Sequence, residues 1–279
     1  MPIREERAST MNRKLEARIA LVVLLVSCPT VTAGAQYVGA NGDLRTVTTE
    51  VTNAPAAGGL GTGQCSDLVE AHQLREEGRL DEAAAVLDSV LSCFAGLMTD
   101  TSATYVCVRE RADLLSLRRE LRTQAQPGRR GPIIRVNYAL AEALQLKAFI
   151  ASSRREWSRA LAILETLARF APYGPEAHCE SGYILVSQGK PAQSLAAYRR
   201  AVALSDEHGT SPAVRAVALR GVGMALTELG RLDEARKAYV ESLTIEPGSS
   251  VAQNELEYIR DLKAQRGGGS AGDSAGGKP

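Results

Sequence analysis

The sequence has little aromatic content and few residues suited to catalysis. Aromatic side chains make up 4% of the 279 residues, and histidine occurs only three times. Sandwiches and barrels are enriched in β-branched and aromatic residues, so this scarcity argues against an all-β fold. His72, His178 and His208 fall in no metal-binding spacing, and no phosphate loop, nucleophile elbow or dinucleotide fingerprint is present. We therefore expect no enzyme activity, no bound metal and no cofactor.

An excess of charge of either sign is also absent. The 33 basic and 32 acidic residues leave a formal net charge of +1. This balance lacks the electrostatic footprint of a nucleic-acid-binding protein. Ala, Leu, Glu and Arg are abundant instead, and these residues favour helices. The composition predicts an all-α protein that does not bind nucleic acid.

Long hydrophobic runs are missing, apart from a short one near the start. Ile19–Val26 is apolar but shorter than the roughly 20 residues that a transmembrane helix needs. Basic residues precede it and Ala33-Gly34-Ala35 follows it, which is typical of an export signal cleaved after Ala35. We interpret residues 1–35 as a signal peptide, so the mature protein is expected in the periplasm or cell envelope. In an alternative interpretation, Leu25–Cys28 is a lipobox and Cys28 is lipidated.

A six-residue string, GRLDEA, occurs twice, at Gly78–Ala83 and at Gly230–Ala235. When the chain is aligned on the final alanine of this string, small residues fall at equivalent positions, spaced by 77, 34 and 41 residues. They are Ala83, Ala160, Ser194 and Ala235. A large residue follows each one four positions later, at Leu87, Leu164, Tyr198 and Tyr239. This spacing predicts one packed face of a helix in each copy. Gly78, Gly189 and Gly230 precede these helices and are expected to adopt a left-handed turn conformation.

These segments resemble the tetratricopeptide repeat, a helix–turn–helix unit of 34 residues with Gly or Ala in its first helix and Ala early in its second. The motifs are VALRGVGMALTELGRLDEARKAYVESLTIEP at Val217–Pro247 and EAHCESGYILVSQGKPAQSLAAYRRAVALS at Glu176–Ser205. More divergent copies lie at Glu142–Pro172 and Cys65–Cys93. The resemblance implies an all-α solenoid of stacked antiparallel helix pairs, in which neighbouring units bury a continuous core.

The repeat spacing divides the chain into segments. A spacing of 77 leaves room for an extra helix at Ala103–Gln124, followed by the breaker Gln126-Pro127-Gly128. The spacing of 41 predicts a longer loop around Glu207–Ala213. The expected organisation is a signal peptide at 1–35, a flexible linker at 36–63, unit 1 at 64–97, the extra helix and basic loop at 98–137, unit 2 at 138–174, unit 3 at 175–208, unit 4 at 214–248, a capping helix at 249–265 and a disordered tail at 266–279.

Four cysteines remain after residues 1–35 are removed, and an even number in an exported chain permits disulfides. Cys65 begins the first helix of unit 1 and Cys93 ends the second, so an antiparallel hairpin brings them together. A bridge there would stabilise the unit by on the order of 3 kcal/mol. Cys93–Cys107 is the competing pairing, and Cys179 is expected to stay unpaired.

A basic stretch at Arg109–Arg135 contains eight arginines and three acidic residues. Surface charge runs usually form solvated helices with local salt bridges. The alternative is that Arg118, Arg119 and Arg122 dock an acidic partner or anionic lipid headgroups.

In the tetratricopeptide repeat family the first helices line a concave groove that receives peptide segments. The resemblance therefore implies a partner-binding groove, in which Phe149, Tyr183 and Met224 are expected to be exposed apolar anchors. The Lys, Asn and Arg set that holds a C-terminal carboxylate in some relatives is not reproduced. Alternatively, the groove positions pack against neighbouring units or against a folded-back tether. They are Gln145, Phe149, Ser152, Ser153, Tyr183, Val186, Arg220, Met224 and Thr227.

The sequence as a whole predicts a non-catalytic protein-interaction scaffold of a bacterial cell envelope. One alternative is a lipid-anchored assembly factor for outer-membrane, pilus or secretion machinery. Another is a regulatory subunit that binds a cell-wall enzyme or glycan. Protein partners are expected, membrane contact is expected only if Cys28 is lipidated, and the oligomeric state is left open.

Overall fold

The computed structural model describes residues 62–101, 104–109, 111–124 and 133–268. The predicted signal peptide, Cys28, the breaker at Gln126–Gly128 and most of the predicted linker and tail lie outside these residues. No helix in the described part is both long enough and apolar enough to cross a membrane.

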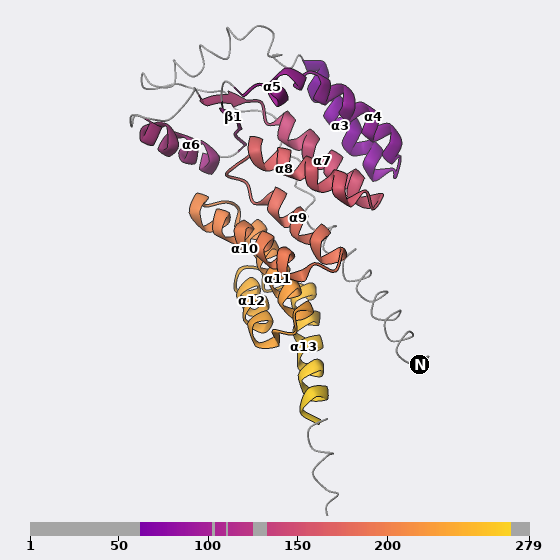
Figure 1. Cartoon of the computed structure of the whole chain (residues 1–279), viewed down its shortest axis with the longest axis vertical. Helices are drawn as coiled ribbons and strands as arrows, with labels where there is room; N and C mark the ends of the chain where they lie inside the picture. Colours follow the sequence, from indigo (N-terminus) through magenta and orange to yellow (C-terminus); the bar gives the residue numbers. More distant parts are fainter. Residues whose placement is uncertain (1–61, 102–103, 110, 125–132, 269–279) are drawn as a thin grey trace, which may run out of the picture. The chain divides into compact units, whose positions relative to one another are not determined.

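The described residues are mostly helical, and the all-α class is confirmed (Figure 1). In chain order the elements are α3 (Thr62–Glu76), α4 (Leu80–Ser92), α5 (Ala95–Thr99), β1 (Thr104–Cys107), α6 (Arg111–Gln124), β2 (Ile133–Val136), α7 (Ala139–Ser153), α8 (Trp157–Phe170), α9 (Glu176–Ser187), α10 (Pro191–His208), α11 (Pro212–Glu228), α12 (Leu232–Ile245) and α13 (Ser250–Gly268). Helix therefore begins two residues earlier than the expected start of unit 1 and extends three residues beyond the expected capping helix.

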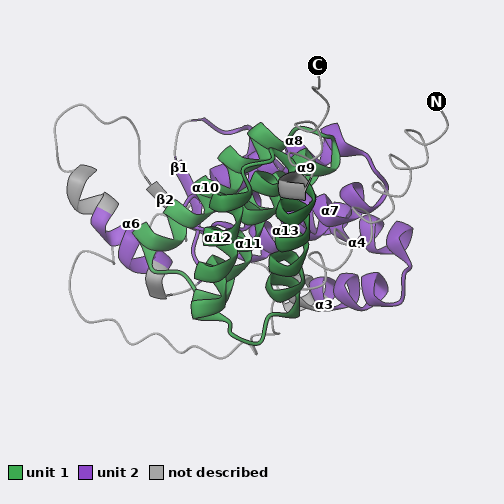
Figure 2. Ribbon diagram, turned by 90° about the horizontal axis from the view of Figure 1, so that it is seen from below, with its two compact units in different colours: residues 1–31, 178–279 green, residues 32–177 purple. Residues whose placement is uncertain are grey.

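The helices form two compact units, which we call the N-terminal unit, up to Ala177, and the C-terminal unit, from His178 onward (Figure 2). In the N-terminal unit α3 packs on α4, α7 packs on α8, and α4 contacts α7 directly. In the C-terminal unit α10 packs on α11, α11 on α12, and α12 on α13. Within each unit, helices that follow one another in the repeat pattern are therefore stacked as neighbours.

Between α4 and α7 the chain forms an insertion, residues 95–136, that contains both strands. β1 and β2 pair in parallel, with Thr104 opposite Ile133 and Cys107 opposite Val136. The expected helix at Ala103–Gln124 is therefore wrong over its first part, because Thr104–Cys107 form a strand and α6 begins only at Arg111. TYVC and IIRV are rich in β-branched and aromatic residues, which favour strands once a pairing partner is present.

The turns inside the helix pairs share one geometry. Gly78, Gly189 and Gly230 have φ values of 76°, 70° and 71°, which confirms the expected left-handed conformation. Arg155 occupies the same place between α7 and α8, with φ 59°. At Gly230 the N–H donates to Thr227 O at 2.9 Å, and the next N–H, of Arg231, donates to Leu226 O at 2.9 Å. The other three turns repeat this Schellman pattern, which satisfies the last carbonyls of the first helix.

The connection from α10 to α11 is short. The expected loop at Glu207–Ala213 is wrong, because α10 continues to His208 and α11 begins at Pro212. Gly209 ends α10 in the left-handed conformation, with φ 63°, and Pro212 sits in the first turn of α11. Glycine after a helix and proline at its start are the residues best suited to such a tight connection. The added residues therefore lengthen the helices instead of the loop.

In the core of the C-terminal unit two tyrosine rings pack directly on glycines. Tyr198, on α10, is 1% exposed, and its ring lies against Gly182 of α9 and Gly221 of α11. A Cβ at Gly182 would lie 2.7 Å from the Tyr198 ring, and one at Gly223 would lie 2.7 Å from the Tyr239 ring. The helices can therefore approach this closely only because these positions carry no side chain.

Ser194 replaces alanine in the third copy without disturbing the packing. Its side chain is fully buried, and its hydroxyl donates to the Gly182 carbonyl at 2.7 Å. The buried polar group is thus satisfied within its own helix pair. At the other end of the C-terminal unit, Leu256 and Ile259 of α13 pack on the same core cluster, as the pattern predicts.

Candidate functional site

Helix α7, a first helix of the N-terminal unit, carries four of the predicted groove residues. Gln145 and Phe149 are half-buried on α7, Ser152 is buried, and Ser153 is exposed. The Ser153 hydroxyl donates to Phe149 O at 3.0 Å, so it caps its own helix. Phe149 is half-buried, not exposed as the resemblance implied, so its aromatic ring is only partly accessible.

Helix α3 adds two residues to this face that the sequence interpretation missed. The Arg75 guanidinium lies 5.7 Å from the centroid of the Phe149 ring, within cation–π range. His72 Nε2 is 2.9 Å from Glu142 Oε1 of α7. His72 and Arg75 follow the small residue Ala71 by one and four positions, as Phe149 and Ser152 follow Ala148. The same alignment extended to unit 1 would have found them.

We call these residues the α3–α7 face: His72, Arg75, Glu142, Gln145 and Phe149. It combines an apolar ring with a cation above it and a histidine–carboxylate pair beside it. The side chains of His72 and Glu142 are 38% and 43% exposed. The face is thus open to solvent and offers both apolar contact and hydrogen-bonding groups to a ligand.

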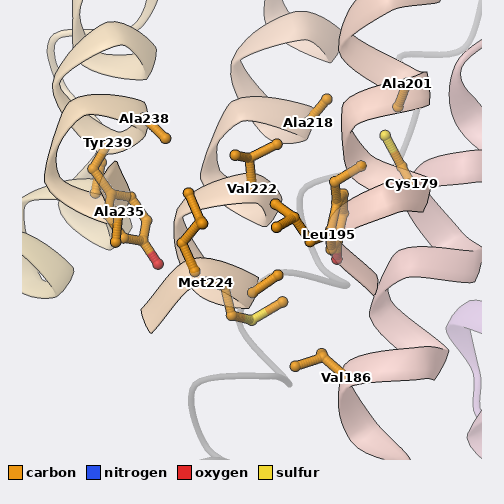
Figure 3. Close-up of a cluster of buried hydrophobic side chains, with 14 of the residues drawn as sticks. Cys179, Val186, Leu195, Ala201, Ala218, Val222, Met224, Ala235, Ala238 and Tyr239 are labelled. Atoms are coloured by element: carbon orange, nitrogen blue, oxygen red, sulfur yellow. The ribbon is translucent and has the colours of Figure 1, made fainter. Parts of the chain in front are cut away.

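The predicted groove residues of α9 and α11 are mostly buried. Met224 is 6% exposed, so the expectation that it is an exposed anchor is wrong. Met224 and Val186, which is 2% exposed, belong to the core cluster that also contains Leu195 and Val222 (Figure 3). Tyr183 is half-buried. In the C-terminal unit the alternative interpretation, in which these positions pack inside the repeat array, therefore holds for Val186 and Met224.

The polar groove positions of α11 are also engaged internally. Arg220 is 4% exposed, and its Nη1 donates to Glu246 at the end of α12. The buried Thr227 hydroxyl donates to Gly223 O at 2.9 Å. The Arg220 contact joins α11 to the end of α12, and the Thr227 hydroxyl is satisfied by a carbonyl of α11 itself.

The cysteines divide by environment. Cys107 is buried as a free thiol whose Sγ lies 3.7 Å from Asn137 O, so the Cys93–Cys107 pairing is wrong. Burial raises the pKa of the Cys107 thiol to about 12, which disfavours the reactive thiolate. Cys93 is exposed, with Sγ 3.7 Å from Ser89 O. The side chain of Cys65 lies outside the described residues, so Cys65–Cys93 stays a prediction.

Four of the eight arginines of the basic stretch lie on α6 of the insertion. Arg118 and Arg119 are exposed, whereas the side chain of Arg122 lies outside the described part. Arg109 is held in a cluster at the base of the insertion, where Nη1 donates to the Tyr138 hydroxyl at 3.2 Å and Nη2 is 3.4 Å from Glu176 Oε1. Burial, together with the nearby Glu176 carboxylate, raises the pKa of Tyr138 well above its ordinary value. The tyrosine therefore serves as a neutral hydrogen-bonding group.

The histidines and acidic residues of the described part form no cluster of three or more metal-binding side chains. Burial and the nearby Arg200 lower the pKa of His178, so this histidine is neutral near pH 7. His208 lies 3.8 Å from Glu207 at the end of α10. The three histidines lie on different helices, α3, α9 and α10.

Two overlapping segments, residues 147–212 and 179–250, match the family model of the tetratricopeptide repeat. The matches cover residues 147–250, which include helices α8 to α12. Over this part, a little more than a third of the chain, the sequence is similar to tetratricopeptide repeats, and its helix pairs and left-handed turns agree with that similarity.

Solved structures of tetratricopeptide repeat proteins are similar to this chain. The first repeat domain of Spaghetti (RPAP3), bound to an HSP90 peptide, is 25% identical, with a TM-score of 0.41 over 46% of this chain and 97% of that one. The Sgt2 domain from Aspergillus fumigatus is 16% identical, with a TM-score of 0.43 over 50% and 88%. YrrB, described as having an unusual peptide-binding site, is 18% identical, with a TM-score of 0.43 over 72% and 77%. No curated protein matches the sequence.

Proposed function

We propose that the protein is a protein-interaction scaffold of a bacterial cell envelope and that its α3–α7 face binds a peptide or helix segment of a partner. The observation that carries this proposal is the partly exposed Phe149 ring beneath the Arg75 guanidinium. An apolar side chain that packs on Phe149 places a neighbouring carboxylate within reach of Arg75. Arginine and aromatic residues are also the usual anchors of protein interfaces.

The surroundings of this pair support recognition of a polar segment. Glu142 and His72 are paired with each other at 2.9 Å, so the pair can both donate and accept hydrogen bonds at the edge of the ring. Gln145 lies one helical turn before Phe149 on the same helix. The proposed ligand is therefore a segment that carries one apolar residue flanked by acidic or amide side chains.

The test is site-specific crosslinking followed by binding. A photoreactive residue at Ser153, beside Phe149, captures the partner in living cells, and the captured segment is then made as a labelled peptide. Phe149→Ala is expected to weaken binding of that peptide about tenfold or more, since loss of a buried aromatic anchor costs about 1–2 kcal/mol or more.

Arg159→Ala provides the matched control. Arg159 is an exposed arginine on α8 that pairs at 3.0 Å with Glu156, the residue just before that helix, so its loss leaves the α3–α7 face intact. Equal binding by the Phe149→Ala variant and the unaltered protein, with both folded by circular dichroism, would contradict the proposal.

The envelope location is part of the proposal and rests on the sequence of residues 1–35. Expression in a bacterium with radiolabelled palmitate separates its two forms. Cleavage after Ala35 gives an unlabelled protein beginning at Gln36, and lipidation gives a labelled protein beginning at Cys28. An uncleaved protein in the cytoplasm would contradict both forms.

A further inference from the structure

The insertion between α4 and α7 adds a surface that the repeat stacking does not require. Helices α4 and α7, which precede and follow the insertion, contact each other directly. Ion pairs join Asp88 to Lys147 and Asp81 to Arg154, so the two helices are held together at two points seven residues apart. Because the stacking is complete without residues 95–136, the insertion is free to serve another purpose.

Helix α6, which is part of the insertion, is held in place by the packing of its apolar side. Leu117, 3% exposed, packs in a small cluster with Val106, Val108 and Tyr173. Leu114 is half-buried against the same cluster. The helix therefore has a buried apolar face and an opposite face turned to solvent.

The solvent face of α6 carries an apolar residue next to two cations. Leu115 is 50% exposed, and Arg118 and Arg119 follow it at three and four positions, which places the three side chains on one side of the helix. We call these three residues the α6 face. An exposed leucine one turn before two arginines offers an apolar contact and positive charge on the same side of the helix.

The arginines of the α6 face make no ion pair with any side chain of the described part. Most other arginines there pair with a carboxylate, as Arg79, Arg215 and Arg231 do. The nearby carboxylate of Asp113 is used inside the insertion, where it accepts a hydrogen bond from the Arg109 N–H at 3.0 Å. The positive charge of Arg118 and Arg119 therefore remains available to a partner.

We propose that the α6 face docks an acidic segment of a partner protein, with carboxylates on Arg118 and Arg119 and an apolar side chain on Leu115. The stretch Arg109–Arg135 contains eight arginines and no lysine, and the planar guanidinium binds carboxylates through two parallel hydrogen bonds. A lipid surface fits less well, because a helix that lies in a membrane inserts its apolar face, and the apolar face of α6 is already buried. This site is separate from the α3–α7 face and does not depend on it.

The probe is a fluorescein-labelled peptide of Glu and Leu residues, titrated with the chain from Gln36 onward and followed by fluorescence anisotropy. Binding is expected to weaken as salt rises and to fall at least tenfold in the double variant Arg118→Glu, Arg119→Glu. Leu115→Ser is expected to weaken binding severalfold, and a peptide of Glu and Ser should bind the unaltered chain equally weakly.

The matched control is the double variant Arg199→Glu, Arg200→Glu, which reverses two adjacent exposed arginines on α10. It is expected to bind the peptide as the unaltered chain does, and so is Phe149→Ala. Circular dichroism shows whether each variant is folded. Equal losses in the two arginine variants would reveal general charge attraction and overturn the proposal.

A second arm uses vesicles containing phosphatidylglycerol. Binding to these vesicles that depends on Arg118 and Arg119, without binding to the peptide, would replace the acidic partner by a lipid surface and overturn the proposal as stated. Lack of binding to the peptide by the unaltered chain overturns it as well.

Discussion

At the scale of single residues, the repeated string GRLDEA is explained by the same contacts at both of its sites. Gly78 and Gly230 adopt the left-handed turn conformation. Arg231 makes two hydrogen bonds to the Glu234 carboxylate, at 2.7 and 2.6 Å, and Arg79 does the same with Glu82 at 2.7 Å. The string therefore combines a turn residue with a clamp across the first turn of the second helix.

The aspartate and alanine of the string serve the contacts between helices. Asp81 pairs with Arg154 of α7, and Asp233 pairs with Lys263 of α13. In the repeat alignment, the position of the small residue in a first helix is occupied by Ala148 in α7 and by Glu257 in α13. Each basic residue lies six positions after it. Ala83 and Ala235 are fully buried. The string thus occurs in the two units whose next helix supplies a basic partner for the aspartate.

Arg155 is the one non-glycine residue of the described part with positive φ. A side chain in this conformation costs about 1–2 kcal/mol. Glycine avoids this cost, but part of the gain is lost because glycine has greater conformational freedom in the unfolded chain. Arg155→Gly is therefore expected to raise the free energy of unfolding by about 0.5–1 kcal/mol, measured by urea denaturation.

The reverse change at the equivalent turn is the control. Gly189 has φ 70°, and Gly189→Ala is expected to lower the free energy of unfolding by about 1 kcal/mol. A stability change of the same sign in both variants would rule out this account of the turns.

Glu180, on α9, is predicted to make the stability depend on pH. Burial raises the pKa of its carboxyl to about 7, from 4.5, so the folded protein holds a proton that the unfolded chain releases between these values. Stability from this group is present below pH 4.5 and is lost as the pH rises through 7. Glu180→Gln is expected to remove this dependence and to stabilise the protein at pH 8 by at most about 3 kcal/mol.

Urea midpoints at pH 5 and pH 8 check this prediction. The control is Glu165→Gln, which removes the same charge at an exposed position on α8. If the two variants show the same difference between pH 5 and pH 8, the burial of Glu180 is not the cause.

At the scale of elements, the insertion shows where sequence patterns stop being informative. The four pairs of helices follow from local spacing, because a helix and its turn depend on residues within a few positions. The strand pair does not, because Thr104 finds its partner Ile133 far along the chain. The spacing of 77 residues between the first two copies therefore predicted a single helix at Ala103–Gln124, where the chain forms a strand and a shorter helix.

The direct contact of α4 with α7 predicts that the insertion can be removed. Joining Phe94 to Asn137 through a short Gly-Ser linker is expected to leave one cooperative thermal transition for the N-terminal unit and a helical circular dichroism spectrum. The reason is that the ion pairs Asp81–Arg154 and Asp88–Lys147 and the packing between the two helices remain.

Loss of the contacts of β1 with α8, and of the insertion with the buried Tyr173 ring, is expected to lower the melting temperature by about 10 °C, equivalent to about 2 kcal/mol. A control chain that keeps the insertion but carries Leu117→Ala separates damage to α6 from loss of the stacking. Unfolding of α3 and α4 in the shortened chain would show that the insertion is needed for the row of helices.

At the scale of the whole molecule, the sequence predicted the fold more accurately than the site. Small and large residues at fixed spacing specify which helices pack, and the structure places Tyr198 and Tyr239 against the glycines that the pattern requires. Exposure is harder to predict, because it depends on how deep a helix lies between its neighbours. Met224 and Val186 occupy groove positions by alignment, yet both lie in the core cluster.

The last helix, α13, limits what this molecule can join. Counting 34 residues on from Leu219, Gly223 and Leu226 of α11 leads to Gln253, Glu257 and Arg260, all of which are exposed. A further helix seated there would have to strip water from an amide, a carboxylate and a guanidinium at once. Fibres that grow by adding copies onto α13 are thus disfavoured.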